Sequence, residues 1–268
     1  MQAEDIRSIS FAGAGNVAGN LALALFNAGF TIRNIISRNP GNAGLLASKV
    51  KAEPVTTIDE IDDKTDLLIL ALPDQAIPGF SLSLKNAGIY TGLVAHTSGS
   101  QSLTAITQYH ANGGVFYPLQ SFTRQSTPDI SKVPFCIEGA SPEITRRLAS
   151  LAGALSKDVR LIDTVQRAQI HLAAVFACNF TNFMYATADC LLAKSRVDPN
   201  ILLPLIQETA LRIQGGDAAA LQTGPAVRGD WSTIDMHLNM LRNNPDMREI
   251  YKTISELIVK MKETGGAC

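Results

Sequence analysis

The sequence IRSISFAGAGNVAGNLALALFNAG, residues 6–29, decides the fold of this chain. It begins as a short apolar strand, turns at Gly13-Ala14-Gly15 and continues as a helix to Gly29. Gly13 permits the tight turn, Gly15 allows a pyrophosphate to approach the backbone, and Ala18 fills the small position where helix meets strand. The positive end of the helix suits phosphates, although a turn without a ligand is the alternative. The residues of this segment that we predict to bind the cofactor are Gly13, Ala14, Gly15, Asn16 and Val17.

Length and composition limit the class of protein. A chain of 268 residues suits two domains, or one large domain with an appendage. The formal net charge is −1 and basic residues do not cluster, so nucleic acid and acidic membrane surfaces are not expected partners. No apolar run approaches the roughly 20 residues of a membrane helix, and the acidic, polar start MQAED is unlike a secretory signal. The four scattered cysteines are typical of reduced thiols, so we expect a soluble, cytoplasmic protein without a metal site.

The end of the second expected strand, residues 31–37, bears on the choice of cofactor. NAD-specific folds place an Asp or Glu about 20 residues after the glycines to bind the ribose 2′-hydroxyl. Here that place is taken by Ser37, Arg38 and Asn39. A hydroxyl and a guanidinium suit a 2′-phosphate, and no carboxylate is present to repel it. The pattern predicts NADP, the alternative being that Arg38 is a solvated turn residue.

Strand and helix patterns alternate over roughly the first 160 residues. Further strands are expected at residues 53–56, 66–73, 92–95, 115–117, 134–138 and 159–162, with a helix at residues 142–155. This alternation predicts an α/β fold with a doubly wound, mainly parallel sheet. Leu72 and Pro73 end one strand, and His96, Thr97 and Ser98 follow the next, so both segments reach the edge where a cofactor binds.

The second part of the chain shows only helical patterns. Asp163 or Thr164 can cap a long helix to about Lys194, Asp198-Pro199 opens another that ends at Gly215-Gly216, and Pro245-Asp246 opens the last, which fades at Gly265-Gly266. We therefore expect a Rossmann domain over residues 1–163 and an all-helical domain over residues 164–268.

The long helix carries a polar stripe. At 100° per residue the members fall on one face, and Asn179 lies at its edge; they are Arg167, His171, Cys178, Asn182, Tyr185 and Asp189. The stripe has no Lys or Glu between its ends, which favours a cleft wall or a subunit interface over a solvated face. A half-exposed helix is the alternative.

A second polar block, GPAVRGD at residues 224–230, precedes Thr233 and His237. Asp230 can cap the following helix and place Thr233 and His237 on one side of it; an ordinary interhelical loop is the alternative. Of the other histidines, His110 is expected at the surface, whereas His96 ends a strand, a better place for function. No histidine pair has metal-ligand spacing, and no G-x-S-x-G motif indicates a hydrolase.

Taken together, these motifs resemble reductases that join an NADP-binding Rossmann domain to a helical C-terminal domain. Such proteins include pyrroline-5-carboxylate reductase, ketopantoate reductase, deazaflavin-dependent NADP oxidoreductases and β-hydroxyacid dehydrogenases. More closely, the chain resembles a poorly characterised bacterial family labelled NADP oxidoreductase. The segments that carry the resemblance are residues 13–17, 96–99 (HTSG), 118–122 (PLQSF), 171–180 and 224–230. The resemblance implies a homodimer with the long helix near its interface.

Two departures limit what the resemblance implies. β-Hydroxyacid dehydrogenases have a catalytic Lys four residues before an Asn, but here Val175 precedes Asn179, and no other Lys lies between Arg167 and Leu192. The closer family usually has His before the PLQSF segment, where this chain has Tyr117. Proton transfer at that point is therefore phenolic or lost.

The sequence predicts an NADP-dependent oxidoreductase that reduces a small carbonyl or imine in a cleft between the domains. His171 is the expected proton donor, because imidazole titrates near neutral pH. Ser98 and Asn179 are candidates to orient the substrate, with Arg228 or Asp230 reaching in from the second domain. The alternative is a non-catalytic NADP-binding redox sensor, which the missing Lys favours and the polar stripe disfavours.

Overall fold

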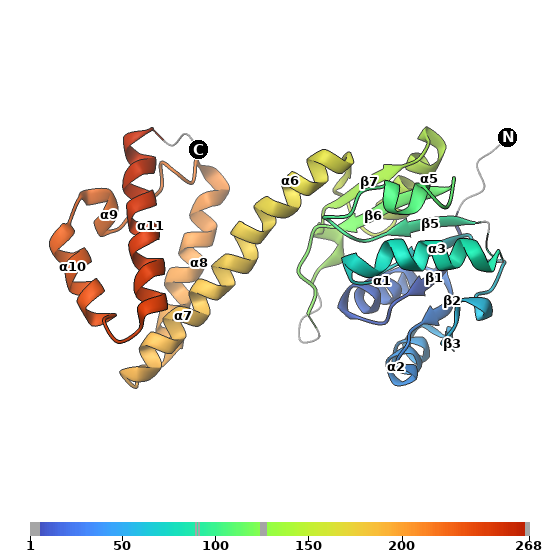
Figure 1. Ribbon diagram of the computed structural model, residues 1–268, viewed down its shortest axis with the longest axis horizontal. Helices are drawn as coiled ribbons and strands as arrows, with labels where there is room; N and C mark the ends of the chain where they lie inside the picture. Colours follow the sequence, from blue (N-terminus) through green and yellow to red (C-terminus); the bar gives the residue numbers. More distant parts are fainter. Residues whose placement is uncertain (1–5, 89, 91, 124–127, 266–268) are drawn as a thin grey trace. The chain divides into compact units, whose positions relative to one another are not determined.

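The computed structural model describes residues 6–88, 90, 92–123 and 128–265 (Figure 1). The contacts divide the chain into two compact units, Met1–Cys178 and Asn179–Cys268. The sequence places its domain boundary at residues 163/164, where strand patterns end; the division by contacts falls further along, inside the helical run that begins there. Among the described residues, no helix has both the length and the apolar character needed to cross a membrane.

The first unit is built on an eight-stranded sheet with the order β3-β2-β1-β4-β5-β6-β7-β8. All neighbouring strands are parallel except β6 and β7. This confirms the doubly wound, mainly parallel sheet, whose order reverses direction at β1. The strands are β1 Ser8–Ala12, β2 Thr31–Ile36, β3 Glu53–Val55, β4 Leu67–Leu70, β5 Leu93–His96, β6 Gly113–Pro118, β7 Phe135–Gly139 and β8 Val159–Leu161.

Helices cover both faces of this sheet (Figure 1). They are α1 Asn16–Asn27, α2 Pro40–Val50, α3 Ile77–Ala87, α4 Thr104–Thr107 and α5 Pro142–Gly153, with short 3₁₀ turns at Ile58–Glu60 (η1), Asp74–Ala76 (η2) and Ile130–Lys132 (η3). Buried residues of α1, α2 and α5 share one apolar cluster with Leu67 and Ile69 of β4. Those of α3 and α4 share the other with Leu68 and Leu70. A strand buried on both faces explains why β4 reads as a continuous apolar run.

The long helical run begins as expected and is irregular in its middle. Asp163 accepts a hydrogen bond from the backbone N–H of Gln166, and the Gln166 side chain bonds back to the Asp163 N–H. The run comprises α6 Thr164–Ala174, a π-helical segment Val175–Phe180 (η4) and α7 Thr181–Lys194. Because a π-helical segment winds more loosely than an α-helix, a stripe drawn at 100° per residue does not continue through it. The single polar stripe expected from the sequence is therefore wrong as a geometric description.

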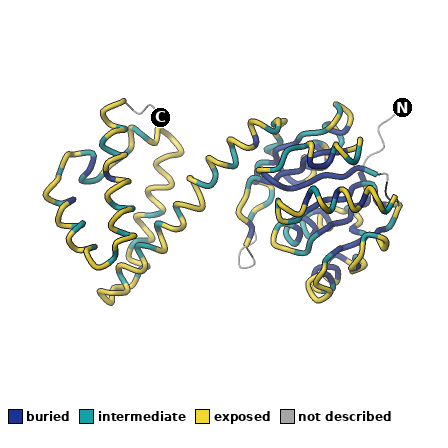
Figure 2. The backbone as a smooth tube through the Cα atoms, in the orientation of Figure 1, coloured by how far each residue is buried: buried dark blue, intermediate teal, exposed yellow. Residues whose placement is uncertain are grey.

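The second unit is helical throughout its described residues, as expected. Its elements after α7 are η5 Pro199–Leu202, α8 Leu203–Arg212, η6 Ile213–Gly215, α9 Pro225–Arg228, α10 Trp231–Met240 and α11 Pro245–Glu263. Within the described part of this unit, only Ala226, Ile234 and Ser255 are buried. Exposed surface predominates on its helices, in contrast to the buried strands of the first unit (Figure 2). The helical unit, taken as a single copy, therefore has almost no apolar core.

Candidate cofactor and active site

The glycine turn after β1 is closed on one side and open on the other. Gly13 has φ +111°, and an added Cβ would overlap the carbonyl oxygen of Ala71. No L-residue with a side chain fits there without strain. Gly15 is the N-cap of α1, and an added Cβ at this position would meet no atom within 4 Å. The turn therefore packs tightly against the end of β4 while its outer side leaves room for a ligand.

The N-terminus of α1 suits an anion. Among the residues that the structure describes, no side chain caps this helix end, and its first turn contains no acidic residue. The first N–H groups of a helix have no partner within the helix, and they carry the positive end of its dipole. A pyrophosphate placed against Gly15 would satisfy both features.

A cavity of about 810 Å³ lies beside this turn at the carboxyl ends of β1, β2 and β4. Its lining includes these residues predicted from the sequence to bind a cofactor: Gly13, Ala14, Gly15, Ser37, Arg38, Asn39, Leu72 and Pro73. Asn16 lines a smaller adjoining cavity of about 270 Å³, together with Ala14 and Gly15. The structure does not place Val17 or Thr97 in either lining. Val17 packs on the apolar core, and the Thr97 hydroxyl lies 3.5 Å from the carbonyl oxygen of Leu70.

Arg38 is the cation at this cavity. Its side chain is exposed and makes no hydrogen bond or ion pair with the described residues. The residues on either side of Arg38 are held by hydrogen bonds. The Ser37 hydroxyl accepts from the Asn39 N–H at 3.2 Å, and Asn39 caps α2 by accepting from the Asn42 N–H at 3.2 Å. A guanidinium beside a large cavity, with no partner in the described part of the chain, fits a phosphate group.

Part of the cavity lining was missed from the sequence. Thr56, Thr57 and Ile58 follow β3, which lies next to β2 in the sheet, and the other wall includes Ala76 and Phe80. Hydrogen bonds from the Thr56 and Thr57 backbone N–H groups, and from the Thr57 hydroxyl, lower the pKa of Glu60 and so tie this loop together. The available signal was the short strand pattern at residues 53–56, whose carboxyl end also meets the cofactor edge.

His171 on α6 contacts two segments of the sheet. Its Nδ1 lies 3.3 Å from the hydroxyl of Tyr117, at the end of β6. Gly99, in the loop after β5, packs against both rings: an added Cβ would lie 2.6 Å from Nδ1 of His171 and 2.8 Å from Cζ of Tyr117. We call Gly99, Tyr117 and His171 the histidine cluster.

The segment that follows Tyr117 connects the histidine cluster to the glycine turn. The Asn16 side-chain amide donates to the carbonyl oxygen of Phe122 at 3.1 Å. The Ser121 hydroxyl lies 3.3 Å from Sγ of Cys178, seven residues beyond His171 on the same helical run. Residues 118–122 thus contact both the cofactor turn and the helical run that carries His171.

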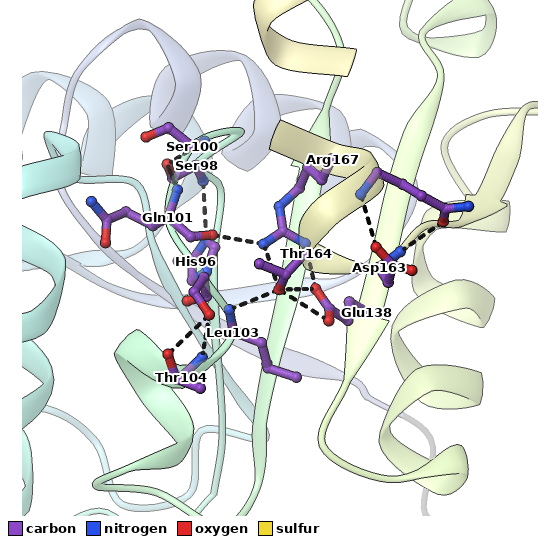
Figure 3. Close-up of polar contacts among 12 residues, drawn as sticks. His96, Ser98, Ser100, Gln101, Leu103, Thr104, Glu138, Asp163, Thr164 and Arg167 are labelled. Atoms are coloured by element: carbon purple, nitrogen blue, oxygen red, sulfur yellow. Dashed lines mark hydrogen bonds and ion pairs between the residues drawn. The ribbon is translucent and has the colours of Figure 1, made fainter. Parts of the chain in front are cut away.

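Arg167 anchors the start of that helix (Figure 3). Its side chain is fully buried, and the guanidinium pairs with the carboxylate of Glu138 on β7. It also donates to the carbonyl oxygen of Gln101 at 2.6 Å. The Thr164 hydroxyl donates to Glu138 at 2.9 Å. The expectation that Arg167 lies on a cleft or interface stripe is therefore wrong, because its charge is used to bind α6 to the sheet.

His96 ends β5 as expected, but its side chain is buried and serves the same loop. Nδ1 accepts from the Ser98 N–H at 3.2 Å, and Nε2 lies 3.3 Å from the carbonyl oxygen of Ser102, to which it donates. Burial, assisted by the positive charge of Arg167, lowers the pKa of His96 to about 4. His96 is thus neutral near pH 7 and supports the turn that contains Gly99, and a direct functional role for it stays a prediction.

Ser98 is buried beside His96. Its hydroxyl oxygen accepts from the N–H groups of Ser100 at 3.1 Å and Gln101 at 3.0 Å (Figure 3). These bonds shape the turn that contains Gly99. A contact between Ser98 and a substrate stays a prediction.

The remaining predicted residues, Asn179, Arg228 and Asp230, belong to the second unit. Asn179 is exposed within η4, and Arg228 is exposed at the end of α9. Asp230 caps α10 as expected, accepting from the Thr233 N–H at 3.1 Å and the Thr233 hydroxyl at 2.8 Å, and these bonds lower its pKa. Roles of these three residues toward a substrate stay predictions.

The strand order, the glycine turn and the cavity define a Rossmann-type dinucleotide-binding fold followed by a helical region. Two family descriptions match the chain: a Rossmann-like domain over residues 3–120 and a domain of unknown function (DUF2520) over residues 133–258. A solved structure, named "putative NADP oxidoreductase BF3122" from Bacteroides fragilis, is 39% identical, covers 95% of this chain and 98% of its own, and has a TM-score of 0.89. The chain belongs to the family of that protein.

More distant solved structures share the fold. Protein TM1727 from Thermotoga maritima is 20% identical over 97% of this chain and 100% of its own, with a TM-score of 0.71. A pyrroline-5-carboxylate reductase from Coxiella burnetii is 14% identical over 98% of this chain and 100% of its own, with a TM-score of 0.60. No curated protein matches the sequence.

Proposed function

We propose that this chain is an NADP-dependent oxidoreductase that reduces a small carbonyl or imine. The observation that carries the proposal is the cavity of about 810 Å³ that joins the glycine turn to Arg38. The closed and open sides of the turn fit a phosphorylated dinucleotide, as does the N-terminus of α1, where Gly15 provides no side-chain cap. The Arg38 guanidinium, which has no partner among the described residues, also fits. The name of the Bacteroides protein, which is 39% identical, supports an oxidoreductase.

Residues around the cavity divide the task of binding the cofactor. The turn and the first N–H groups of α1 would hold the pyrophosphate. Arg38 and the Ser37 hydroxyl would bind the 2′-phosphate. Bound NADPH would supply a hydride to the substrate carbon.

His171 supplies the proton in this proposal. When hydride is delivered to the carbonyl carbon, the π electron pair would move onto oxygen. The imidazolium of His171 would give its Nε2 proton to that oxygen, or to nitrogen in an imine. The ring hydrogen would then remain on Nδ1, against the Tyr117 oxygen, until solvent returns a proton to Nε2. The ring has its Nδ1 engaged by Tyr117, and its Nε2 makes no hydrogen bond with the described residues. Nε2 is therefore available to a substrate.

Binding measurements test the cofactor. We expect micromolar NADPH dissociation, and a loss of affinity of about 10- to 100-fold in Arg38→Ala, because a charge-assisted contact to phosphate is removed. NADH binding should be weak and unchanged. Arg7→Ala, which removes an exposed positive charge at the opposite end of β1, is the matched control. Failure of both nucleotides to bind would leave only the fold and would reject the enzyme.

A second candidate function is a non-catalytic NADP-binding redox sensor. It is favoured by a departure from the resemblance to β-hydroxyacid dehydrogenases. That resemblance implies a catalytic Lys four residues before Asn179, where this chain has Val175 within η4. Both functions require cofactor binding, but only the enzyme oxidises NADPH when small carbonyls and imines are supplied. His171→Ala should abolish that oxidation and leave NADPH affinity nearly intact, whereas His110→Ala should change neither. Oxidation at the wild-type rate in His171→Ala would reject His171 as the proton donor.

A further inference from the structure

Tyr117 and His171 meet through one atom of each ring. The Tyr117 hydroxyl lies 3.3 Å from Nδ1 of His171, and the rings are edge-on, with centroids 6.2 Å apart and an interplanar angle of 73°. Within the described part of the chain, this is the hydrogen bond that each of these side chains makes. The two residues come from different elements, β6 and α6.

The backbone at Gly99 makes room for this contact. A side chain there would begin within 3 Å of both rings, at Nδ1 of His171 and Cζ of Tyr117. Real Cβ atoms do not approach other atoms so closely. The two rings therefore meet because the loop after β5 has no side chain at this position.

The direction of the hydrogen bond follows from burial. Tyr117 is buried, and a buried O–H without an acceptor is unfavourable. Nδ1 of a neutral imidazole can accept, and the hydrogen of the ring is then on Nε2. Burial, with smaller contributions from Cys136 and Asp74 against an opposing one from Arg167, raises the pKa of Tyr117 to about 12. The phenol thus keeps its proton at neutral pH.

We propose that Tyr117 is the positioning residue for His171: it holds Nδ1 and leaves Nε2 as the nitrogen that donates to the substrate. In the imidazolium form the phenol oxygen accepts the Nδ1 hydrogen instead, so Nδ1 stays with Tyr117 in both protonation states. This inference rests on the proposed role of His171 as proton donor. It assigns a function to Tyr117, the residue that directly precedes the PLQSF segment.

The tautomer of His171 can be measured without substrate or turnover. Long-range ¹H–¹⁵N NMR of ¹⁵N-labelled full-length protein, well above the ordinary pKa of imidazole, distinguishes a protonated from an unprotonated ring nitrogen. We expect unprotonated Nδ1 and protonated Nε2 in His171 of the wild type, and a tautomer mixture in Tyr117→Phe. His171→Gln assigns the signals. The bond between Tyr251 and Nδ1 of His237, at 2.8 Å, is an internal reference in the same spectrum.

Two further variants control for folding. Tyr90→Phe removes another buried tyrosine hydroxyl, which donates to the carbonyl oxygen of Leu93 at 3.1 Å, and should leave the His171 signals unchanged. Gly99→Ala keeps both rings but inserts a methyl group between them, so it should reproduce the mixture seen in Tyr117→Phe. A wild-type ring with the same tautomer mixture as Tyr117→Phe, or with its hydrogen on Nδ1, would overturn the proposal.

Kinetics separate this inference from the proposed function. If a reducible substrate is found, Tyr117→Phe should lower kcat about three- to ten-fold, as expected for one lost hydrogen bond, without changing NADPH affinity. An unchanged kcat would overturn the positioning role. If the protein binds no NADPH, the proposed oxidoreductase is rejected. If the NMR result is nevertheless as expected, the hydrogen bond between Tyr117 and His171 is still supported.

Discussion

The buried guanidinium of Arg167 is bonded to the carboxylate of Glu138, 29 residues earlier in the chain. This pair joins the first turn of α6 to β7, and the bond from Arg167 to the Gln101 carbonyl adds the loop that contains Gly99. His171 follows Arg167 by four residues, about one helical turn. The position of His171 against Tyr117 and Gly99 therefore depends on a buried ion pair one turn away.

Removing Arg167 should be strongly destabilising. Arg167→Met leaves the Glu138 carboxylate without its cation in a largely buried place, and we expect a loss of about 3–5 kcal/mol in the free energy of unfolding. Urea denaturation measures it. Arg160→Met breaks the exposed pair between Arg160 and Asp158 and should change the free energy of unfolding far less. An equal decrease in the free energy of unfolding in the two variants would show that the buried Arg167–Glu138 pair stabilises the fold no more than an exposed pair does.

Gly13→Ala should abolish cofactor binding and destabilise the sheet unit. The change forces a side chain into φ +111° and into the carbonyl oxygen of Ala71, so the turn must move. Isothermal titration with NADPH and a urea midpoint measure the two effects. Gly44→Ala, inside α2 with no atom within 4 Å of the added Cβ, is the matched control and should be neutral or stabilising by about 0.5–1 kcal/mol. NADPH affinity of the wild-type value in Gly13→Ala would contradict the assignment of the turn.

The burial of His96 makes the free energy of unfolding depend on pH. Its pKa is about 4 in the folded chain against an ordinary 6.5, so between these values the unfolded chain binds more protons. The contribution of His96 to the free energy of unfolding is fully present above pH 6.5 and is lost as the pH falls toward 4. From pH 7.5 to pH 5 this amounts to about 1–2 kcal/mol. His96→Gln should have a smaller difference between urea midpoints at these two pH values. The same pH dependence in wild type and variant would mean that His96 is not the group responsible.

The apolar surface of the helical unit predicts a homodimer. Large side chains on several helices are exposed, including Leu205, Trp231 and Met240, whereas buried residues in the described part of this unit are few. We propose that a second copy of this chain covers part of them, since exposed apolar surface beyond scattered single residues marks association sites. Light scattering at micromolar concentration should give twice the chain mass. The single tryptophan, Trp231, should show a red shift of its emission as dilution separates the copies. A monomeric mass would contradict the proposal.

Much of the fold could be predicted from patterns among residues that are close together in the sequence. Strand β4 was readable because a strand buried on both faces is apolar at every position, and the Asp163 cap because a helix start has a short, regular signature. The glycine turn was readable for the same reason, since Gly13 and Gly15 act within a few residues of each other. The π-helical segment Val175–Phe180 was not readable, because nothing in its composition departs from an ordinary helix.

By itself the sequence determined the order of the elements and the glycine turn. It also determined that Arg38, and not an Asp or Glu, follows the second strand. Each of these features is encoded within a few neighbouring residues. Only the tertiary structure decided which polar groups meet. Arg167 pairs with Glu138, His171 with Tyr117, and His96 turns into the interior, although the sequence alone assigned Arg167 and His96 to other surroundings. These partners are separated by 29 and 54 residues, and strand order and helix packing bring them together. No spacing along the chain encodes that meeting.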